Sequence, residues 1–204
     1  MKQLTLSVLL LASSLACERI DPNELFASAE AGLTLAYENP SLPQPRRAQE
    51  RLQVRIAKVE QENMKLLVTK TFTTFEGQMD VLFAYENGGV SSMRDAKTTA
   101  SVLLPPHFPN VRGWEERGRR YRVEGRAAMP ETGLRLPDGM NRMGVWVVSE
   151  TVDGSGPRRR SFYLPRLGEI ETQEFQAGSW IPVNRLFSYG FADIPIIPSR
   201  KNKN

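Results

Sequence analysis

The chain has 204 residues with 27 Lys and Arg, 23 Asp and Glu, a formal net charge of +4, one cysteine and one histidine. A single cysteine excludes an intramolecular disulfide framework and a cysteine-based metal site, so apolar burial and sheet hydrogen bonds must supply the stability. The length suits one domain with a sizeable core, and the charge balance is only mildly basic.

Residues 1–16 have the pattern of an export signal. One basic residue, Lys2, precedes a mostly apolar run over residues 4–15, and the small residue Ala16 follows it. At about 1.5 Å per helical residue this run spans roughly 18 Å, which is short of the ~30 Å hydrocarbon core of a bilayer. We therefore expect residues 1–16 to be removed as a signal peptide.

Cys17, directly after Ala16, resembles the cysteine of the bacterial lipobox, although Ser14 and Leu15 differ from its commoner residues. In the lipobox a signal peptidase cleaves before the cysteine, and the thiol carries a diacylglycerol. Several acyl chains, at about 0.8 kcal/mol per buried methylene, hold a domain on a membrane without a spanning helix. The alternative is secretion with a free thiol, which is a liability in an oxidising compartment. We predict lipidation at Cys17.

The residue after Cys17 bears on the location of the protein. In the sorting rule known for bacterial lipoproteins, Asp at this position retains the protein on the inner membrane, whereas this chain has Glu18. We expect a lipoprotein of the outer membrane that faces the periplasm and has the membrane as a partner through its lipid. Export makes nucleic acid a poor partner, and none is expected.

A short helix is predicted within residues 17–32, between the lipidation site and the first strand. Asp21 suits the N-cap, Pro22 suits the first helical position, and Gly32 suits the end of the stretch NELFASAEA.

From residue 33 the helical period disappears, and segments rich in Val, Thr, Tyr and Phe follow one another. Val54 and Ile56 would point to one face and Arg55 to the other, as in an antiparallel strand with one solvated face. Turn-forming residues separate the segments, among them Asn87-Gly88, which supplies the positive φ values of a tight hairpin. The predicted strands of the first half are residues 33–38, 51–60, 65–75 and 79–86.

A Pro-rich link at residues 103–109 leads to further hairpins. The segment MGVWVV at 143–148 is apolar on both faces, as a covered central strand would be. Residues 187–204 are predicted to be an irregular basic tail. Trp114, Trp146 and Trp180 are expected to pack in the core or on sheet faces. The predicted strands of the second half are residues 119–126, 143–148, 158–164 and 168–175. The sequence therefore predicts an all-β domain over residues 33–186, with about eight to ten strands in one sheet system.

The order of LTLAYEN, LLPP, GWEERGRRYRVEG, GMNRMGVWVV and RRRSFYLPRLGEIETQEF is similar to that in exported bacterial proteins of the TapB type. These are grouped loosely with the LolA/LolB/LppX-like carriers, in which a Tyr-rich strand ends in a pattern like Y-x-P-x-x-G-x-[VI]. Residues 163–170, YLPRLGEI, resemble that pattern, and the likeness extends over residues 33–175. It implies a strongly curved single antiparallel sheet, a half-barrel, whose concave face can hold an acyl chain or pack against a helix.

The sequence lacks the residue sets of familiar catalytic machinery. His107 is the only histidine and lies in the Pro-rich link, where a loop residue is expected rather than the proton shuttle of a triad. There is no G-x-S-x-G elbow and no S-x-x-K pair, and lipidation would occupy the only thiol. No Asp-rich loop offers a hard-cation site. We predict no enzymatic activity, no cofactor and no metal.

Three acidic residues of the last predicted strand, residues 168–175, are candidates for a cation site or a glycosidase-like acid pair. Glu169 and Glu171 would lie on one strand face, with Glu174 following. We interpret all three as solvated charges at a sheet edge.

Two arginine stretches at predicted hairpin ends form a candidate contact with an anionic surface. If they lie together at one rim, they could dock the domain on phosphate-bearing lipid or lipopolysaccharide. Ordinary solvated turns are the alternative. The residues of this candidate site are Arg117, Arg119, Arg120, Arg158, Arg159 and Arg160.

Two functional hypotheses remain open at this point. One is a membrane-tethered lipoprotein that holds an apolar, acyl-chain ligand on the concave face of its sheet. That hypothesis requires a sizeable apolar cavity open at one rim. The other is a structural or accessory envelope lipoprotein that acts through a surface for a protein partner.

Metabolic labelling with radioactive palmitate tests the predicted attachment. We expect label in the wild-type chain and none in Cys17→Ala, because the acylated thiol is the only cysteine. A wild-type chain that carries no label, or that is found whole in the soluble cell interior, contradicts the prediction.

Overall fold

The structure, a computed structural model, describes residues 25–95 and 97–191 and is nearly all β. The elements are β1 (Thr34–Glu38), α1 (Gln44–Gln49), β2 (Leu52–Glu62), β3 (Lys65–Thr73), β4 (Gln78–Glu86), β5 (Gly89–Met93), β6 (Thr99–Leu104), β7 (Gly113–Glu116), β8 (Arg119–Ala128), β9 (Met143–Thr151), β10 (Arg159–Leu164), β11 (Gly168–Gln176) and β12 (Ser179–Gly190). The predicted all-β class is confirmed, and the twelve strands of this part of the chain exceed the predicted eight to ten.

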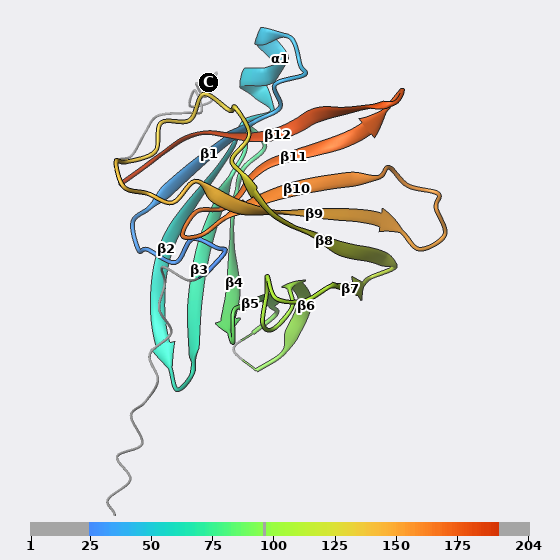
Figure 1. Cartoon of the computed structure of the whole chain (residues 1–204). Coiled ribbons are helices and arrows are strands. Elements are labelled where there is room, and N and C mark those ends of the chain that lie inside the picture. The colour runs from blue at the N-terminus through green and yellow to red at the C-terminus, as the bar shows by residue number, and fades with distance from the viewer. Residues whose placement is uncertain (1–24, 96, 192–204) are drawn as a thin grey trace, which may run out of the picture.

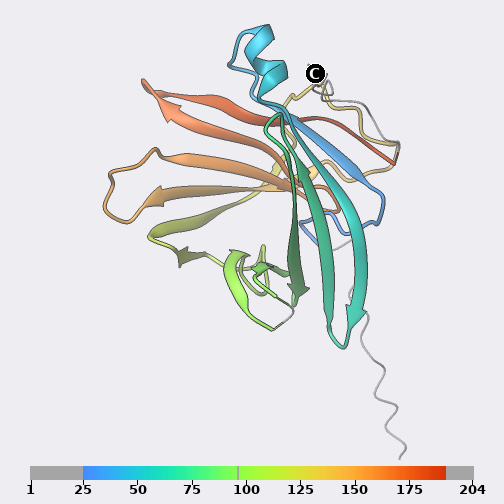
Figure 2. The same ribbon diagram turned by 180° about the vertical axis from the view of Figure 1, so that it is seen from behind.

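All twelve strands form one antiparallel sheet, in the order β6-β5-β4-β3-β2-β1-β12-β11-β10-β9-β8-β7. The pairing of β1 with β12 joins the two halves of the chain. Strands β2–β4 run across the direction of β9–β12, so the sheet curves strongly and nearly closes as a barrel (Figures 1 and 2). Side chains bridge the two edge strands, since Ser101 Oγ donates a hydrogen bond to Glu116 Oε1 at 3.2 Å and Arg117 donates one to the Ala100 carbonyl. The predicted single curved sheet is confirmed, and it closes further than a half-barrel.

Local sequence explains most of the strands and their turns. Val54 and Ile56 of β2 are buried while Arg55 is exposed, as the alternation predicted. Asn87 and Gly88 both have positive φ, 51° and 76°, which is the backbone of a tight two-residue hairpin turn between β4 and β5. Strand β9 is central and has buried residues on both faces.

The predicted helix before the first strand is wrong for the residues that the structure describes. Residues 25–33 form no helix; they are an irregular segment whose apolar side chains are buried inside the curved sheet, and we name it the N-terminal segment. Burial overrides the local helix preference here, because Leu25 and Phe26 are surrounded by sheet side chains. The proposed N-cap, Asp21, lies outside the described residues. The described residues form one helix, α1, which follows Pro43 in the stretch between two predicted strands where turn-forming residues were expected.

Hydrogen bonds fix the N-terminal segment to opposite walls of the sheet. Tyr85 in β4 donates its hydroxyl to the Ser28 carbonyl at 2.8 Å. On the other wall the Arg166 amide donates to the Leu25 carbonyl, also at 2.8 Å. A Cβ at Gly168 would lie 3.3 Å from the Cα of Ala27, so this glycine allows the segment to approach the turn between β10 and β11.

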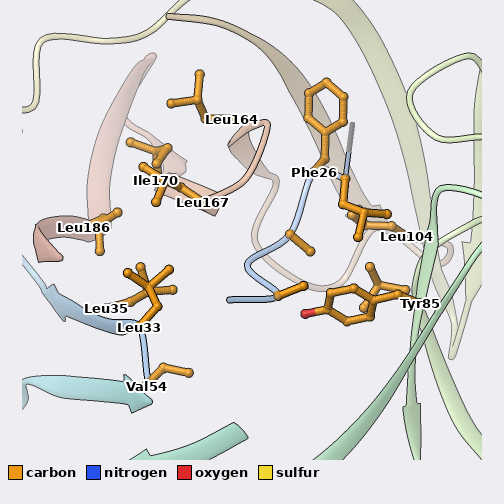
Figure 3. Close-up of a cluster of buried hydrophobic side chains, with 14 of the residues drawn as sticks. Phe26, Leu33, Leu35, Val54, Tyr85, Leu104, Leu164, Leu167, Ile170 and Leu186 are labelled. Atoms are coloured by element: carbon orange, nitrogen blue, oxygen red, sulfur yellow. The ribbon is translucent and has the colours of Figure 1, made fainter. Parts of the chain in front are cut away.

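The apolar core is formed around this segment, with side chains from both halves of the sheet pointing toward it (Figure 3). Leu186 and Ile170 come from β12 and β11, and Leu35 and Val54 come from β1 and β2. The part of the interior around the N-terminal segment is therefore filled by the protein's own side chains.

Strand β12 continues through Gly190, so the predicted irregular tail does not begin at residue 187. Residues 192–204 of that tail lie outside the described residues. In the described ranges, no helix has the length and hydropathy needed to cross a membrane.

The N-terminal segment also covers Lys70 of β3. The Lys70 ammonium donates to Ser28 Oγ at 3.3 Å and lies 5.3 Å and 5.6 Å from the ring centroids of Phe83 and Tyr85. Burial lowers the pKa of Lys70 to about 8 from its ordinary 10.5, because the charged form is deprived of water. The partly buried ammonium of Lys70 is thus charged at neutral pH at a cost in stability.

Lys70→Met should raise the free energy of unfolding at pH 7 and flatten its dependence on pH. Between about pH 8 and 10.5 the unfolded chain binds more protons at Lys70 than the folded chain, so wild-type stability rises with pH in that window. Urea unfolding at pH 7 to 9.5 measures the effect, below the range in which the tyrosines ionise. Lys65→Met on the same strand is the control, since Lys65 is exposed. A rise that persists in Lys70→Met contradicts the assignment.

Candidate functional site: a polar groove on the concave face

A cavity of about 820 Å³ opens on the concave face of strands β8–β12, beside the apolar core. We name it the polar groove, because most of its lining side chains carry hydroxyl, amide, guanidinium or carboxylate groups. Its lining residues are Asn39, Ser41, Arg119, Tyr121, Ser149, Arg159, Ser161, Tyr163, Glu169, Thr172, Glu174, Gln176, Ile181, Val183 and Asn184.

Strand register places five of the lining side chains in one row. Tyr121 pairs directly with Ser149, Ser149 with Arg159, Arg159 with Glu174, and Glu174 with Ile181. Directly paired residues in antiparallel strands present their side chains on the same face. Five neighbouring strands thus each contribute one side chain to a row across the groove.

A bulge in β11 corrects the prediction for the acidic residues. The register between β10 and β11 shifts at Ile170, so Glu169 and Glu171 lie on opposite faces rather than on one face. Glu169 lines the groove, whereas Glu171 on the outer face is only 1% exposed and is paired with Arg185 Nε at 2.6 Å. Glu171 is therefore not a solvated edge charge. Glu174 does lie at the groove surface.

Hydrogen bonds hold the polar side chains of the groove in place. Arg159 Nε donates to Glu174 Oε1 at 2.8 Å, and this hydrogen bond lowers the pKa of Glu174. Asn184 Nδ2 donates to Glu169 Oε1 at 3.1 Å. The Glu174 carboxylate is therefore ionised at neutral pH and paired before any ligand arrives.

Aromatic rings form one side of the groove. Tyr121 stacks on Trp114, with ring centroids 4.7 Å apart and planes at 3°. Tyr163 meets Phe108 edge-on at 5.9 Å, and burial raises the pKa of its hydroxyl well above the ordinary value. Trp114 Nε1 is buried without a hydrogen-bond partner. The rings are thus packed into the fold and present pre-formed surfaces.

The hairpin ends that carry the two arginine stretches lie next to each other in the structure. The Val152 amide donates to the Gly118 carbonyl at 2.9 Å, which joins the ends of hairpins β7–β8 and β9–β10. Arg119 crosses between them, donating to Ser149 Oγ at 3.2 Å and to the Pro157 carbonyl at 3.3 Å. In Figure 1 the ends of hairpins β7–β8 and β9–β10 lie near each other on the right.

The six arginines nevertheless do not share one face or one role. Arg119 and Arg159 line the polar groove on the concave face. Arg120 and Arg158 border a separate cavity of about 170 Å³, and Arg120 is paired with Glu115 at 2.9 Å. Arg117 lies at the end of hairpin β7–β8, beside Glu116. Contact with an anionic surface stays a prediction for these residues.

Arg160 has a structural environment that the sequence did not reveal. Its guanidinium lies between two indole rings, 4.5 Å from the centroid of Trp146 and 4.7 Å from that of Trp180. Its Nε donates to Gln173 Oε1 at 2.7 Å. Gln173 in turn donates to Glu171, so the arginine is joined to the buried ion pair of the outer face. The four strands that carry these residues, β9 to β12, bring them together only in the folded sheet.

The sequence also singled out Cys17 and His107. Cys17 lies outside the described residues, so its lipidation stays a prediction. His107 is exposed in the loop between β6 and β7, as expected. Within residues 25–95 and 97–191, no three His, Cys, Asp or Glu side chains come together as a metal site.

Comparison with known proteins found similarity only at the level of solved structures. No family model and no curated protein matches the sequence. A protein inferred to be a lipoprotein, from Parabacteroides distasonis ATCC 8503, is 11% identical with a TM-score of 0.46, over 81% of this chain and 98% of that one. A protein inferred to be exported, with a YmcC-like fold, from Bacteroides fragilis NCTC 9343, is 10% identical with a TM-score of 0.44, over 81% and 99%. The resemblance to TapB-type and LolA-like proteins stays a prediction.

Arg160→Gln should lower the free energy of unfolding by about 1–2 kcal/mol, because it removes two cation–π contacts and loosens Gln173. Arg158→Gln is the control and should change stability by less than about 0.5 kcal/mol, since Arg158 is exposed and contacts one ring at 5.6 Å. Urea unfolding followed by tryptophan fluorescence measures both. Equal losses in the two variants would show that Arg160 has no special role.

Proposed function

We propose that the protein is an exported, lipid-anchored bacterial envelope protein that binds a polar ligand in its polar groove. The groove is the observation that carries the proposal: about 820 Å³ of open space, within the ~300–1,000 Å³ range of small-molecule sites, lined by preorganised polar groups and aromatic rings. The anchor is Cys17, and the location is the outer membrane facing the periplasm.

The position of the chain's entry into the sheet supports this arrangement. Leu25 is bonded at the turn between β10 and β11, whereas the groove extends to the ends of hairpins β9–β10 and β11–β12, at the other end of these strands. Cys17 precedes Leu25 by eight residues, a reach of at most about 28 Å. This length allows a lipid at Cys17 to lie on the side of the β10–β11 turn, away from the hairpin ends of the groove.

The lining of the groove favours a polar ligand over an acyl chain. An acyl-chain site needs Phe, Leu, Met and Val side chains around an open cavity, whereas the apolar half of this interior is occupied by the N-terminal segment. Among the lining residues, Ile181 and Val183 are the aliphatic ones. We keep the acyl chain as the competing outcome of the experiment below.

One observation favours a second candidate function, an accessory lipoprotein with a protein partner. Phe175 and Val152, at the ends of hairpins β11–β12 and β9–β10, are 42% and 50% exposed. Exposed apolar side chains beside a binding site suit a contact with another protein. In either case we propose no enzymatic activity, which is supported by the exposed loop position of His107.

Native mass spectrometry and hydrogen exchange together test the proposal on the mature lipidated protein in mild detergent. We expect no lipid other than the covalent one in the native spectrum. The polar low-mass fraction of a cell-envelope extract should slow exchange in peptides covering 159–176. Ser161→Val/Thr172→Val should abolish that slowing, because the two hydroxyls form a 2.6 Å hydrogen-bonded pair in the groove.

Thr71→Val is the matched control, since Thr71 lies on the outer face of β3, bonded to Asp80. It should leave the slowing unchanged. A stoichiometric fatty acid or phospholipid in the native spectrum, with no response to the polar fraction, would establish the acyl-chain function instead.

A further inference from the structure

The charges of the polar groove are balanced and already engaged. Two arginines, Arg119 and Arg159, face two glutamates, Glu169 and Glu174, so the formal charge of the lining is zero. Arg159 is bonded to Glu174, and Glu169 accepts from Asn184. A strongly charged ligand that displaced Arg159 from Glu174 would leave one of these two charges unpaired. The lining therefore suits a ligand without net charge.

The remaining polar groups both donate and accept hydrogen bonds. Ser149, Ser161 and Thr172 carry hydroxyls, while Asn184 and Gln176 carry amides, and each such group offers a donor and an acceptor. They come from four strands, so they are spread over the length of the groove rather than gathered at one point. The complementary ligand is one that also presents donors and acceptors along its whole length.

An aromatic surface lies beside these polar groups. Tyr121 lines the groove and is held by its stack on Trp114, so its position is fixed before a ligand binds. Tyr163 of β10, two strands from β12, adds a second ring. A saccharide has hydroxyls at its periphery and an apolar C–H face on its ring, and such a face packs on aromatic rings. Aromatic side chains combined with paired amides and carboxylates therefore match a sugar better than an acyl chain or a phosphate.

We propose that the ligand of the polar groove is a neutral oligosaccharide, with a sugar ring packed beside Tyr121 and hydroxyls bonded by the row from Ser149 to Glu174. The inference rests on the proposed function, since it names the class of polar ligand. The volume of about 820 Å³ leaves room for a short chain of sugar rings rather than for one ring. The groove lies on a sheet face, whereas an extended peptide that adds a strand binds along a sheet edge, and the edge strands here are β6 and β7.

The test is titration of the mature lipidated protein in mild detergent, followed by tryptophan fluorescence and by calorimetry. The probes are maltotriose, cellotriose and chitotriose, with trialanine, inorganic phosphate and phosphatidylglycerol vesicles as the other classes. We expect saturable binding of at least one trisaccharide. A fluorescence change is expected as well, because Trp114 stacks on the ring that the sugar approaches.

Variants distinguish the groove from other surfaces. Tyr121→Ala should weaken binding of the trisaccharide at least tenfold, and Ser161→Val/Thr172→Val should do the same. Tyr121→Phe, which keeps the ring, should retain most of the affinity, and urea unfolding of Tyr121→Ala shows whether its loss comes from unfolding. Arg120→Gln, the neighbour on the outer face of β8, should bind as the wild type does.

The outcomes separate this inference from the proposed function. Binding of phosphate or trialanine in the groove, without any trisaccharide, overturns the oligosaccharide and keeps a polar ligand. Binding of vesicles alone, or of no probe, overturns the oligosaccharide, and a lipid found in the native spectrum removes the polar ligand as well. Trisaccharide binding that Tyr121→Ala leaves unchanged also overturns the assignment, because the ring would then have no part in it.

Discussion

The fold depends on the burial of the N-terminal segment inside a curved sheet. A single sheet that bends this strongly has a concave face too wide for its own side chains to fill, and residues 25–33 occupy part of that space. Their backbone is bonded to β4 through Tyr85 and to the β10–β11 turn through Arg166, so the segment ties two distant walls together. The polar groove lies on the part of the concave face that the N-terminal segment does not occupy.

The sequence predicted eight of the twelve strands in the described residues, because alternation and turn residues are local signals, whereas β5, β6, β7 and β12 were not among the predicted strands. Alternation in β2 and the Asn87-Gly88 turn follow from period-two burial and positive φ, which single residues reveal. The helix prediction failed at Leu25 and Phe26, because tertiary burial decides the structure there.

The groove could be predicted only in part. The arginines at the hairpin ends were identified from sequence, and the structure does bring the two hairpins together. Their division between two faces was not foreseen, because it depends on the pairing of β8 with β9 and of β9 with β10. The bulge at Ile170, which sends Glu169 into the groove and Glu171 into a buried ion pair, leaves no signature in the sequence. The sequence likewise gives no sign of contacts between residues far apart in the chain, such as Arg160 with Trp180.

Hydrogen exchange at two backbone amides tests the central claim most directly. The Gly32 amide donates to the Ile56 carbonyl, and the Arg166 amide donates to the Leu25 carbonyl, so both report on the seating of the N-terminal segment. The account predicts that both exchange as slowly as the amides of β1, through global unfolding. Exchange of either amide orders of magnitude faster than β1 would mean that the segment leaves the sheet, and the interior would then be open to an apolar ligand.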